Sequence, residues 1–199
     1  MNRNRMWLGC IVVALALVPA LAVAGDPPGQ QQGMDPMMAA MIEASTPGAQ
    51  HAKLVELCGE YDITATMMTG PGGEPQTAAG TSSFESIYDG RYVLEKVTIG
   101  EGMMLMEGMG FTGYDNTKGE FFSTWIDKMS TGIMLLTGDL DDEGRMVMSG
   151  SYQDPLSGDE ILVRIVNTYE SADKHVMDYY ETRGAGPEVR TMDIVYERR

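Results

Sequence analysis

Residues 61–196 alternate between short extended segments and tight turns, and this pattern constrains the fold more than any other feature. The turns combine aspartate or asparagine side chains with glycine, which adopts the positive φ that many tight turns require. They fall at residues 89–90, 115–119, 141–144, 154–158 and 183–187. A spacing of roughly 10–15 residues leaves no room for the crossover helices of a parallel sheet. The sequence therefore predicts consecutive antiparallel hairpins.

The segments between the turns alternate in the manner of strands. In residues 120–127, one face carries Phe121, Ser123, Trp125 and Asp127. In residues 161–169, one face carries Ile161, Val163, Ile165 and Tyr169, and the other carries Leu162, Arg164, Val166 and Thr168. About ten consecutive strands rarely leave two edges of a sheet open. We therefore predict an all-β fold, an antiparallel up-and-down barrel of about ten strands with a partly filled cavity. A two-sheet sandwich is the alternative, because periodicity does not separate the two.

The first 58 residues differ from the rest of the chain. Residues 1–24 have the pattern of a signal peptide, with Arg3 and Arg5 before an apolar run and small residues at the expected cleavage site. Residues 25–49 are rich in Pro, Gly, Gln and Met and predict a flexible linker. Residues 50–58 predict a short helix that leads into the barrel domain, residues 50–199. We expect a periplasmic or secreted protein with no membrane span after signal removal.

Charge and cysteine content narrow the possible functions. Without residues 1–24, the chain has 12 basic and 29 acidic residues, so its surface disfavours nucleic acid and anionic membranes. Only Cys58 then remains, so no intramolecular disulfide is available. The hydrophobic core has to supply the stability of an exported domain.

Four segments resemble a bacterial family of proteins, the domain-of-unknown-function family 1579. They are residues 89–92, 113–116, 123–132 and 150–158, and the Ser-Thr-Trp-Ile-Asp stretch in the third is the most specific. The similarity covers about residues 46–198. It implies an exported protein related to the calycin barrels, which include lipocalins, fatty-acid-binding proteins and nitrobindins. Calycins commonly begin their first strand with Gly-x-Trp, where this chain has Gly59-Glu60-Tyr61. The resemblance implies no catalytic residue.

Strand position and mixed polarity nominate the residues that would line a cavity: Trp125, Asp127, Tyr92, Arg164 and Tyr179. Trp125 would form an apolar wall and Asp127 a polar anchor for a ligand. The alternative is structural: Trp125 fills the barrel, and Asp127 pairs with a buried arginine or a turn amide.

Methionines and histidines offer two further interpretations. Met103, Met104, Met106 and Met109 form one cluster, and Met34, Met37, Met38 and Met41 form a helical stripe. Thioethers suit Cu(I), but methionine also lines adaptable apolar surfaces, and neither cluster has an adjacent histidine or cysteine. A nitrobindin-like barrel would hold haem through a histidine such as His175, whose position beside a turn instead indicates an exposed side chain.

Catalysis finds little support in these patterns. Cys58 has no activating neighbour, and no serine lies in a nucleophile elbow. We predict no catalytic residue, no metal site and no cofactor, and a small apolar or amphipathic molecule as the partner. Two alternatives remain: a hydrolase or isomerase that uses barrel carboxylates such as Glu95 and Glu107, and a structural or interaction module with a filled barrel.

Overall fold

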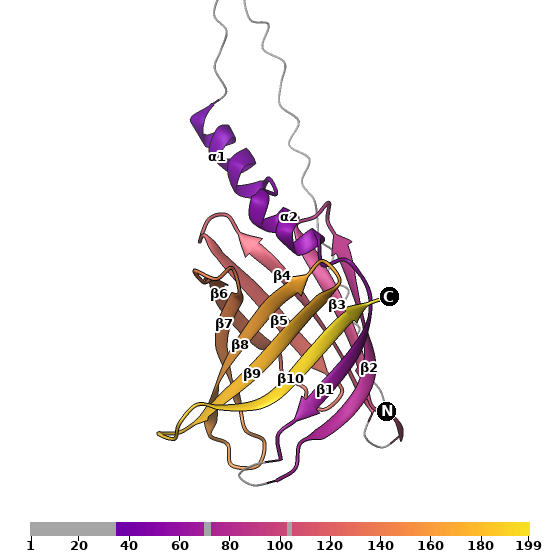
Figure 1. Ribbon diagram of the computed structural model, residues 1–199. Helices are drawn as coiled ribbons and strands as arrows, with labels where there is room; N and C mark the ends of the chain where they lie inside the picture. Colours follow the sequence, from indigo (N-terminus) through magenta and orange to yellow (C-terminus); the bar gives the residue numbers. More distant parts are fainter. Residues whose placement is uncertain (1–34, 70–72, 103–104) are drawn as a thin grey trace, which may run out of the picture. The chain divides into compact units, whose positions relative to one another are not determined.

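The computed structural model describes residues 35–69, 73–102 and 105–199. In this part of the chain, two short helices precede ten strands (Figure 1). The helices are α1 (Pro36–Ser45) and α2 (Ala49–Val55). The strands are β1 (Gly59–Met67), β2 (Gln76–Ile87), β3 (Tyr92–Ile99), β4 (Met106–Asp115), β5 (Glu120–Asp127), β6 (Met134–Leu140), β7 (Met146–Gln153), β8 (Glu160–Ser171), β9 (Lys174–Arg183) and β10 (Val189–Arg198).

All ten strands pair with their neighbours in sequence, and the first also pairs with the last. The β1–β10 ladder runs antiparallel from Tyr61 opposite Arg198 to Met67 opposite Met192. This ladder closes the sheet into a barrel with the strand order β1-β10-β9-β8-β7-β6-β5-β4-β3-β2. The predicted up-and-down barrel is confirmed, and the two-sheet sandwich is excluded.

The hairpin turns form where aspartate and glycine mark them in the sequence. Asp115 Oδ1 accepts hydrogen bonds from the amides of Thr117 and Lys118, and Gly119 follows with a φ of 73°. Asp141 Oδ1 accepts from the amides of Glu143 and Arg145. In each case the side chain satisfies backbone donors that the strand ladder leaves free, which fixes the register of the next strand.

Helix α1 follows the methionine stripe of the sequence. Asp35 caps it by accepting a hydrogen bond from the amide of Met37, and Pro36 occupies its first turn. None of its residues is buried, and Met37 is 74% exposed. The helical spacing of Met37, Met38 and Met41 is thus confirmed. The predicted signal peptide and Met34, Met103 and Met104 lie outside the described residues.

Helix α2 lies across one end of the barrel and packs against β3 and β4 (Figure 1). Its Leu54 is only 2% exposed and joins the apolar cluster around Phe121. The guanidinium of Arg198 holds the end of this segment, donating to the carbonyl oxygens of Cys58 at 2.6 Å and Glu56 at 2.9 Å. The end of β10 therefore fixes the helix against the barrel.

Candidate ligand-binding site

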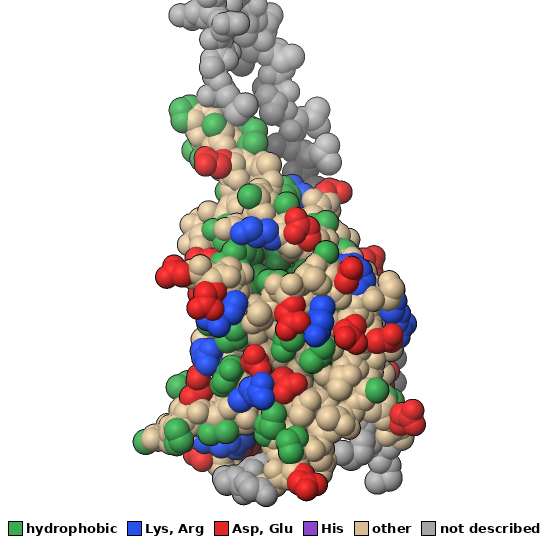
Figure 2. Space-filling model, viewed as in Figure 1, with side chains coloured by type: hydrophobic (Ala, Val, Ile, Leu, Met, Phe, Trp, Pro, Cys, Tyr) green, Lys and Arg blue, Asp and Glu red, His purple; other side chains and the backbone are tan. Residues whose placement is uncertain are grey.

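A cavity of about 1060 Å³ occupies the barrel interior. Its lining includes Leu54 and Leu57 near α2 and residues 128–133 between β5 and β6, so it reaches towards both barrel ends. Figure 2 shows hydrophobic side chains gathered in a hollow at the end where α2 lies. The volume lies just above the range of roughly 300–1,000 Å³ that is typical of small-molecule sites.

Methionine side chains supply much of the apolar wall. Unbranched thioether side chains adapt their shape to different occupants, so this wall suits a ligand of irregular outline. The predicted role of methionine as cavity lining is supported at Met106, whereas Met109 is 41% exposed. The methionines in the wall are Met106, Met129, Met134, Met146, Met148, Met177 and Met192.

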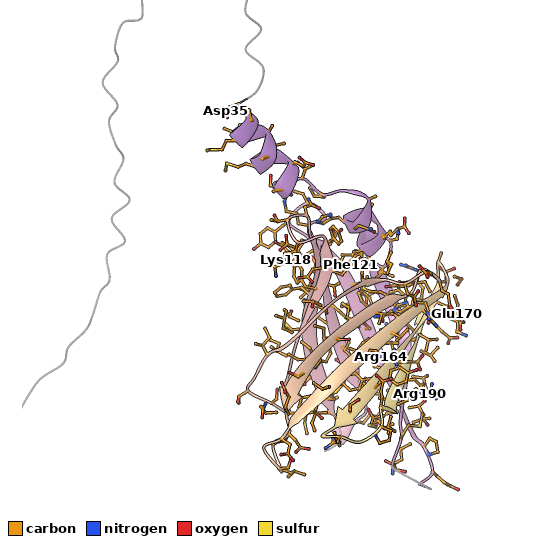
Figure 3. All side chains as sticks on the ribbon, turned by 90° about the vertical axis from the view of Figure 1, so that its left-hand side faces the viewer. Asp35, Lys118, Phe121, Arg164, Glu170 and Arg190 are labelled. Atoms are coloured by element: carbon orange, nitrogen blue, oxygen red, sulfur yellow. The ribbon has the colours of Figure 1, made fainter. Side chains whose placement is uncertain are left out.

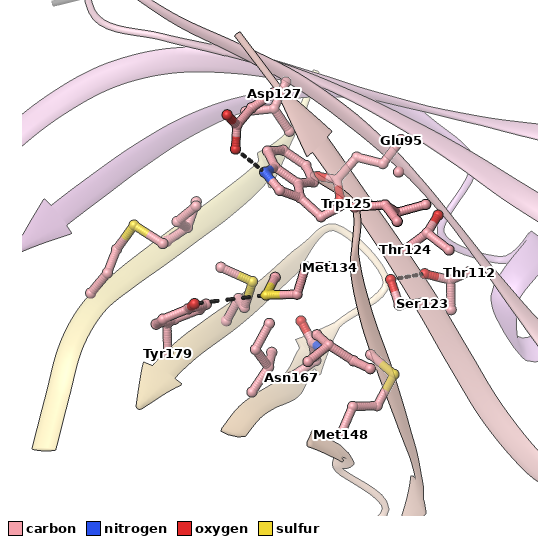
Figure 4. A pocket seen from close by; sticks show the side chains of 18 of the residues that line it. Glu95, Thr112, Ser123, Thr124, Trp125, Asp127, Met134, Met148, Asn167 and Tyr179 are labelled. Atoms are coloured by element: carbon pink, nitrogen blue, oxygen red, sulfur yellow. Dashed lines mark hydrogen bonds between the residues drawn. The ribbon is translucent and has the colours of Figure 1, made fainter. Parts of the chain in front are cut away.

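Trp125 and Asp127 lie together in the cavity wall, as their shared strand face predicts (Figure 4). The indole Nε1 donates to Asp127 Oδ2 at 2.9 Å, and Asp127 Oδ1 accepts from the amide of Met129 at 2.8 Å. Gly108 lies beneath the indole, where the Cβ of any other residue would overlap the ring. Asp127 therefore both faces the cavity and satisfies a turn amide, so its oxygens are already engaged.

Of the other three predicted lining residues, Tyr179 faces the cavity, whereas Tyr92 and Arg164 face outward. Tyr179 lines the cavity, with its hydroxyl 3.9 Å from the sulfur of Met134. Tyr92 and Arg164 lie outside the cavity lining, because the pleat directs them opposite to Val93 and Ile165, which face inward. Tyr92 packs against the rings of Tyr88, Phe111 and Phe122.

Arg164 forms a bidentate ion pair instead. Its Nε and Nη2 donate to the two oxygens of Glu188 at 2.8 and 2.6 Å, and its guanidinium lies over the ring of Tyr180. Figure 3 shows Arg164 on β8. These contacts hold the guanidinium on the outer face of the barrel.

Glu95 is the central polar group of the cavity, and strand pattern alone did not nominate it as a ligand contact. Its Oε1 accepts hydrogen bonds from Ser82 Oγ at 2.9 Å and from Tyr196 Oη at 3.1 Å. Its Oε2 makes no hydrogen bond within the described part of the chain. Burial raises the pKa of Glu95 to about 7, against the lowering effect of the two hydroxyl donors. The carboxyl group is therefore close to half-ionised at neutral pH.

His175 is the second polar group of the cavity. It is only 5% exposed and lines the cavity, which corrects the expectation of an exposed turn histidine. Its ring stacks on Tyr196 with centroids 4.2 Å apart. Burial, assisted by the positive charge of Arg198, lowers the pKa of His175 to about 4. The imidazole is thus neutral at pH 7, and neither ring nitrogen hydrogen-bonds to any described residue.

Glu95 and Glu107, the carboxylates named for the hydrolase or isomerase alternative, do not face each other. Glu95 lies opposite Gly110 and faces inward, whereas Glu107 lies opposite Thr98 and forms an ion pair with Lys128. Burial raises the pKa of the Cys58 thiol, which keeps it in its unreactive protonated form. Within residues 35–69, 73–102 and 105–199, no three His, Cys, Asp or Glu side chains gather to hold a metal ion.

The buried carboxyl couples stability to pH. The pKa of Glu95 rises from 4.5 to about 7 on folding, so its contribution is full below about pH 4.5 and is lost as the pH rises through about 7. We expect the free energy of unfolding of the wild type to fall by about 2–3 kcal/mol relative to Glu95→Gln over this range. Urea unfolding at a series of pH values measures the difference.

His175 titrates in the opposite sense and needs its own control. Its pKa falls from 6.5 to about 4 on folding, so its contribution is present above about pH 6.5 and is lost as the pH falls through about 4. The Glu95→Gln comparison is therefore repeated in a His175→Gln background. If the free energy of unfolding depends on pH in the same way with and without Glu95→Gln in both backgrounds, the pKa of Glu95 is not raised and the prediction is wrong.

No helix in the described ranges is long and apolar enough to cross a membrane. No curated protein matches the chain. One family model does match, over residues 46–198, and its description reads "Protein of unknown function (DUF1579)". This span contains α2 and every strand of the barrel. The chain therefore belongs to the DUF1579 family.

Proposed function

We propose that this chain is an exported protein that binds a small apolar or amphipathic molecule inside its barrel. The cavity of about 1060 Å³ carries the proposal, because a barrel that served only as a structural module would fill this space with its own side chains. Export rests on the signal pattern of residues 1–24. The periplasm or the cell exterior is the compartment that goes with it.

The character of the wall supports a ligand with a large apolar part. Methionine, aliphatic and aromatic side chains together supply most of the lining, and polar groups such as Glu95 and His175 reach into the same space. This combination is typical of small-molecule sites, where apolar contact provides affinity and a few polar groups fix orientation. Glu95 and Glu107 lie on opposite faces of the sheet, so the carboxylate pair suggested for a hydrolase or isomerase does not support that alternative.

A cavity-filling variant tests the proposal. Ser123 lines the cavity, whereas Ser149 is exposed on β7. We expect the full chain to bind an uncharged apolar dye such as Nile red, with a rise in dye fluorescence. Ser123→Trp places an indole in the empty space and should weaken dye binding on the order of tenfold, since the dye and the indole compete for one volume.

Ser149→Trp is the matched control, because it adds the same ring to the outer surface. We expect it to leave dye affinity unchanged, and thermal unfolding checks that both variants are folded. Equal affinity in the two variants would place the dye elsewhere on the protein. Absence of dye binding to the wild type would contradict an accessible apolar cavity.

Haem is the second candidate occupant, and the neutral imidazole of His175 favours it. An imidazole in this state can coordinate iron, and the ring faces a cavity large enough for a tetrapyrrole. Titration of the full chain with haem tests this candidate by visible absorption. A Soret band that is present in the wild type and altered in His175→Ala would favour haem. A spectrum identical to that of free haem would remove it.

A further inference from the structure

Acidic residues outnumber basic ones among the described lining residues of the cavity. Glu95 and Asp127 supply two carboxyl groups, and Lys128 is the one basic residue among the described lining residues. Lys128 lies beyond the end of β5, is 68% exposed and is paired with Glu107. An anionic head group inside the barrel would therefore meet carboxyl groups with no cation to balance it.

The second carboxyl oxygen of Glu95, Oε2, accepts no hydrogen bond from any described residue. Ser82 and Tyr196 both donate to Oε1, which holds the carboxyl group in one orientation. Glu95 lines the cavity. Its Oε2 has no hydrogen-bond partner among the described residues, yet it is not completely enclosed by protein atoms. Oε2 is therefore accessible from the cavity and can accept a hydrogen bond from an occupant.

Aromatic rings line the cavity beside Glu95, since Phe84 lies opposite Glu95 in the β2–β3 ladder and Tyr196 donates to its carboxyl group. Phe84, Tyr196 and His175 all line the cavity and contact one another, with the centroid of Phe84 5.9 Å from each of the other two. Tyr169 extends the group, its ring 5.9 Å from His175. The faces of Phe and Tyr rings attract cations, and a neutral imidazole accepts a hydrogen bond from one. A carboxylate, aromatic faces and a neutral histidine together favour a positively charged group.

We propose that the ligand is an apolar amine whose protonated nitrogen binds Oε2 of Glu95 beside the aromatic rings, with its apolar body along the methionine wall and Trp125. This rests on the proposed function and adds the chemical class of the ligand. The strongly acidic chain agrees with it, since negative charge raises the local concentration of cations and repels anions. Glu95 and Trp125 both line the cavity (Figure 4), so one ligand can offer its amine to the first and its apolar body to the second.

Three ligands of equal chain length test the head group: decylamine, 1-decanol and decanoate. Calorimetric titration of the full chain at about pH 8 keeps the amine protonated, the fatty acid ionised and Glu95 largely ionised. We expect decylamine to bind about tenfold more tightly than 1-decanol, because a hydrogen bond to a charged group adds to the same apolar contact. We expect decanoate to bind more weakly than 1-decanol.

Substitutions and a change of pH then test whether Glu95 is the group that binds the amine. Glu95→Gln keeps the shape and a carbonyl acceptor but removes the charge, so decylamine should lose its advantage while 1-decanol retains its affinity. Lowering the pH to about 5.5 protonates Glu95 and should weaken amine binding in the wild type but not in Glu95→Gln. Glu85→Gln is the matched control, because Glu85 is exposed on β2 and lies outside the cavity lining, so it should leave the preference intact.

The outcomes separate this inference from the proposed function. If 1-decanol binds as tightly as decylamine, or if Glu95→Gln keeps the preference for the amine, the amine inference is wrong and the apolar binding site stands. Tighter binding of decanoate overturns the inference in the same way. If none of the three binds, the proposed function fails, and the inference fails with it.

Discussion

Replacing Phe121 with alanine should lower the free energy of unfolding by about 3–5 kcal/mol, the range for removing a fully enclosed phenylalanine. Phe121 is 0% exposed and lies near the barrel end that α2 covers (Figure 3). Its ring packs edge-on against Tyr114 with centroids 4.9 Å apart, in a cluster with Leu54 and Val93. Alanine would leave a void where the helix and the strands meet, and urea unfolding measures the loss.

Phe111→Ala is the matched control for this prediction. Phe111 is 39% exposed on the outer face of β4, where its ring contacts Tyr92. Since this ring remains partly in water, we expect its removal to cost about 1 kcal/mol. A similar loss in both variants would mean that the interior around Phe121 is not packed as described.

Replacing Arg198 with methionine should lower the free energy of unfolding by about 2–4 kcal/mol, because several charge-assisted hydrogen bonds are lost together. The guanidinium donates to the carbonyls of Glu56, Cys58 and Ala172 and lies 4.8 Å from the ring centre of Tyr61. Methionine retains much of the apolar stem but leaves these carbonyl oxygens to water. Thermal and urea unfolding, read by circular dichroism, measure the effect.

Arg199 provides the control, because it is the next residue and carries the same charge. Its guanidinium pairs only with Asp62 among the described residues, and both side chains are substantially exposed. Surface pairs of this kind contribute little, so Arg199→Met should cost at most about 1 kcal/mol. Equal losses at the two positions would show that Arg198 does not join β10 to the end of α2.

The barrel could be predicted from the sequence because the turn residues and the strand alternation both indicate consecutive antiparallel hairpins. Aspartate and glycine mark the hairpins, and the strands between them are too close in sequence for any other connection. The inward positions of Trp125, Asp127 and Tyr179 followed from the same alternation. Closure itself was inferred from the cost of exposed edges, and the pairing of β1 with β10 confirms it.

The site was harder to predict because closure brings together residues that are distant in sequence. Glu95 and Tyr196 are 101 positions apart and meet only across the closed barrel. A signal was nevertheless present, since Glu95 alternates with the buried Val93 and Val97 and is the one charged residue in that row. His175 shares the inward row of β9 with Met177 and Tyr179, although its place beside a turn suggested exposure.

Two predicted lining residues, Arg164 and Tyr92, lie on the outer face of the barrel because the sequence does not show which face of a strand points inward. Alternation correctly separates Arg164 from Ile161, Val163 and Ile165, but it does not say which row faces inward when both rows carry apolar groups. The outer row of β8 includes Leu162 and Val166, so both faces looked suitable for a cavity. For Tyr92, the outer surface provides three aromatic neighbours, which a single sequence does not reveal.

Native mass spectrometry of the protein purified from its own host tests most directly whether the barrel interior holds a ligand. We expect a mass above that of the polypeptide, with the excess released on denaturation as a small apolar molecule. The same preparation of Ser123→Trp should lack this excess, since its indole takes the space. A wild-type protein with only the polypeptide mass, which also gains no mass when decylamine or 1-decanol is added, would contradict a binding cavity.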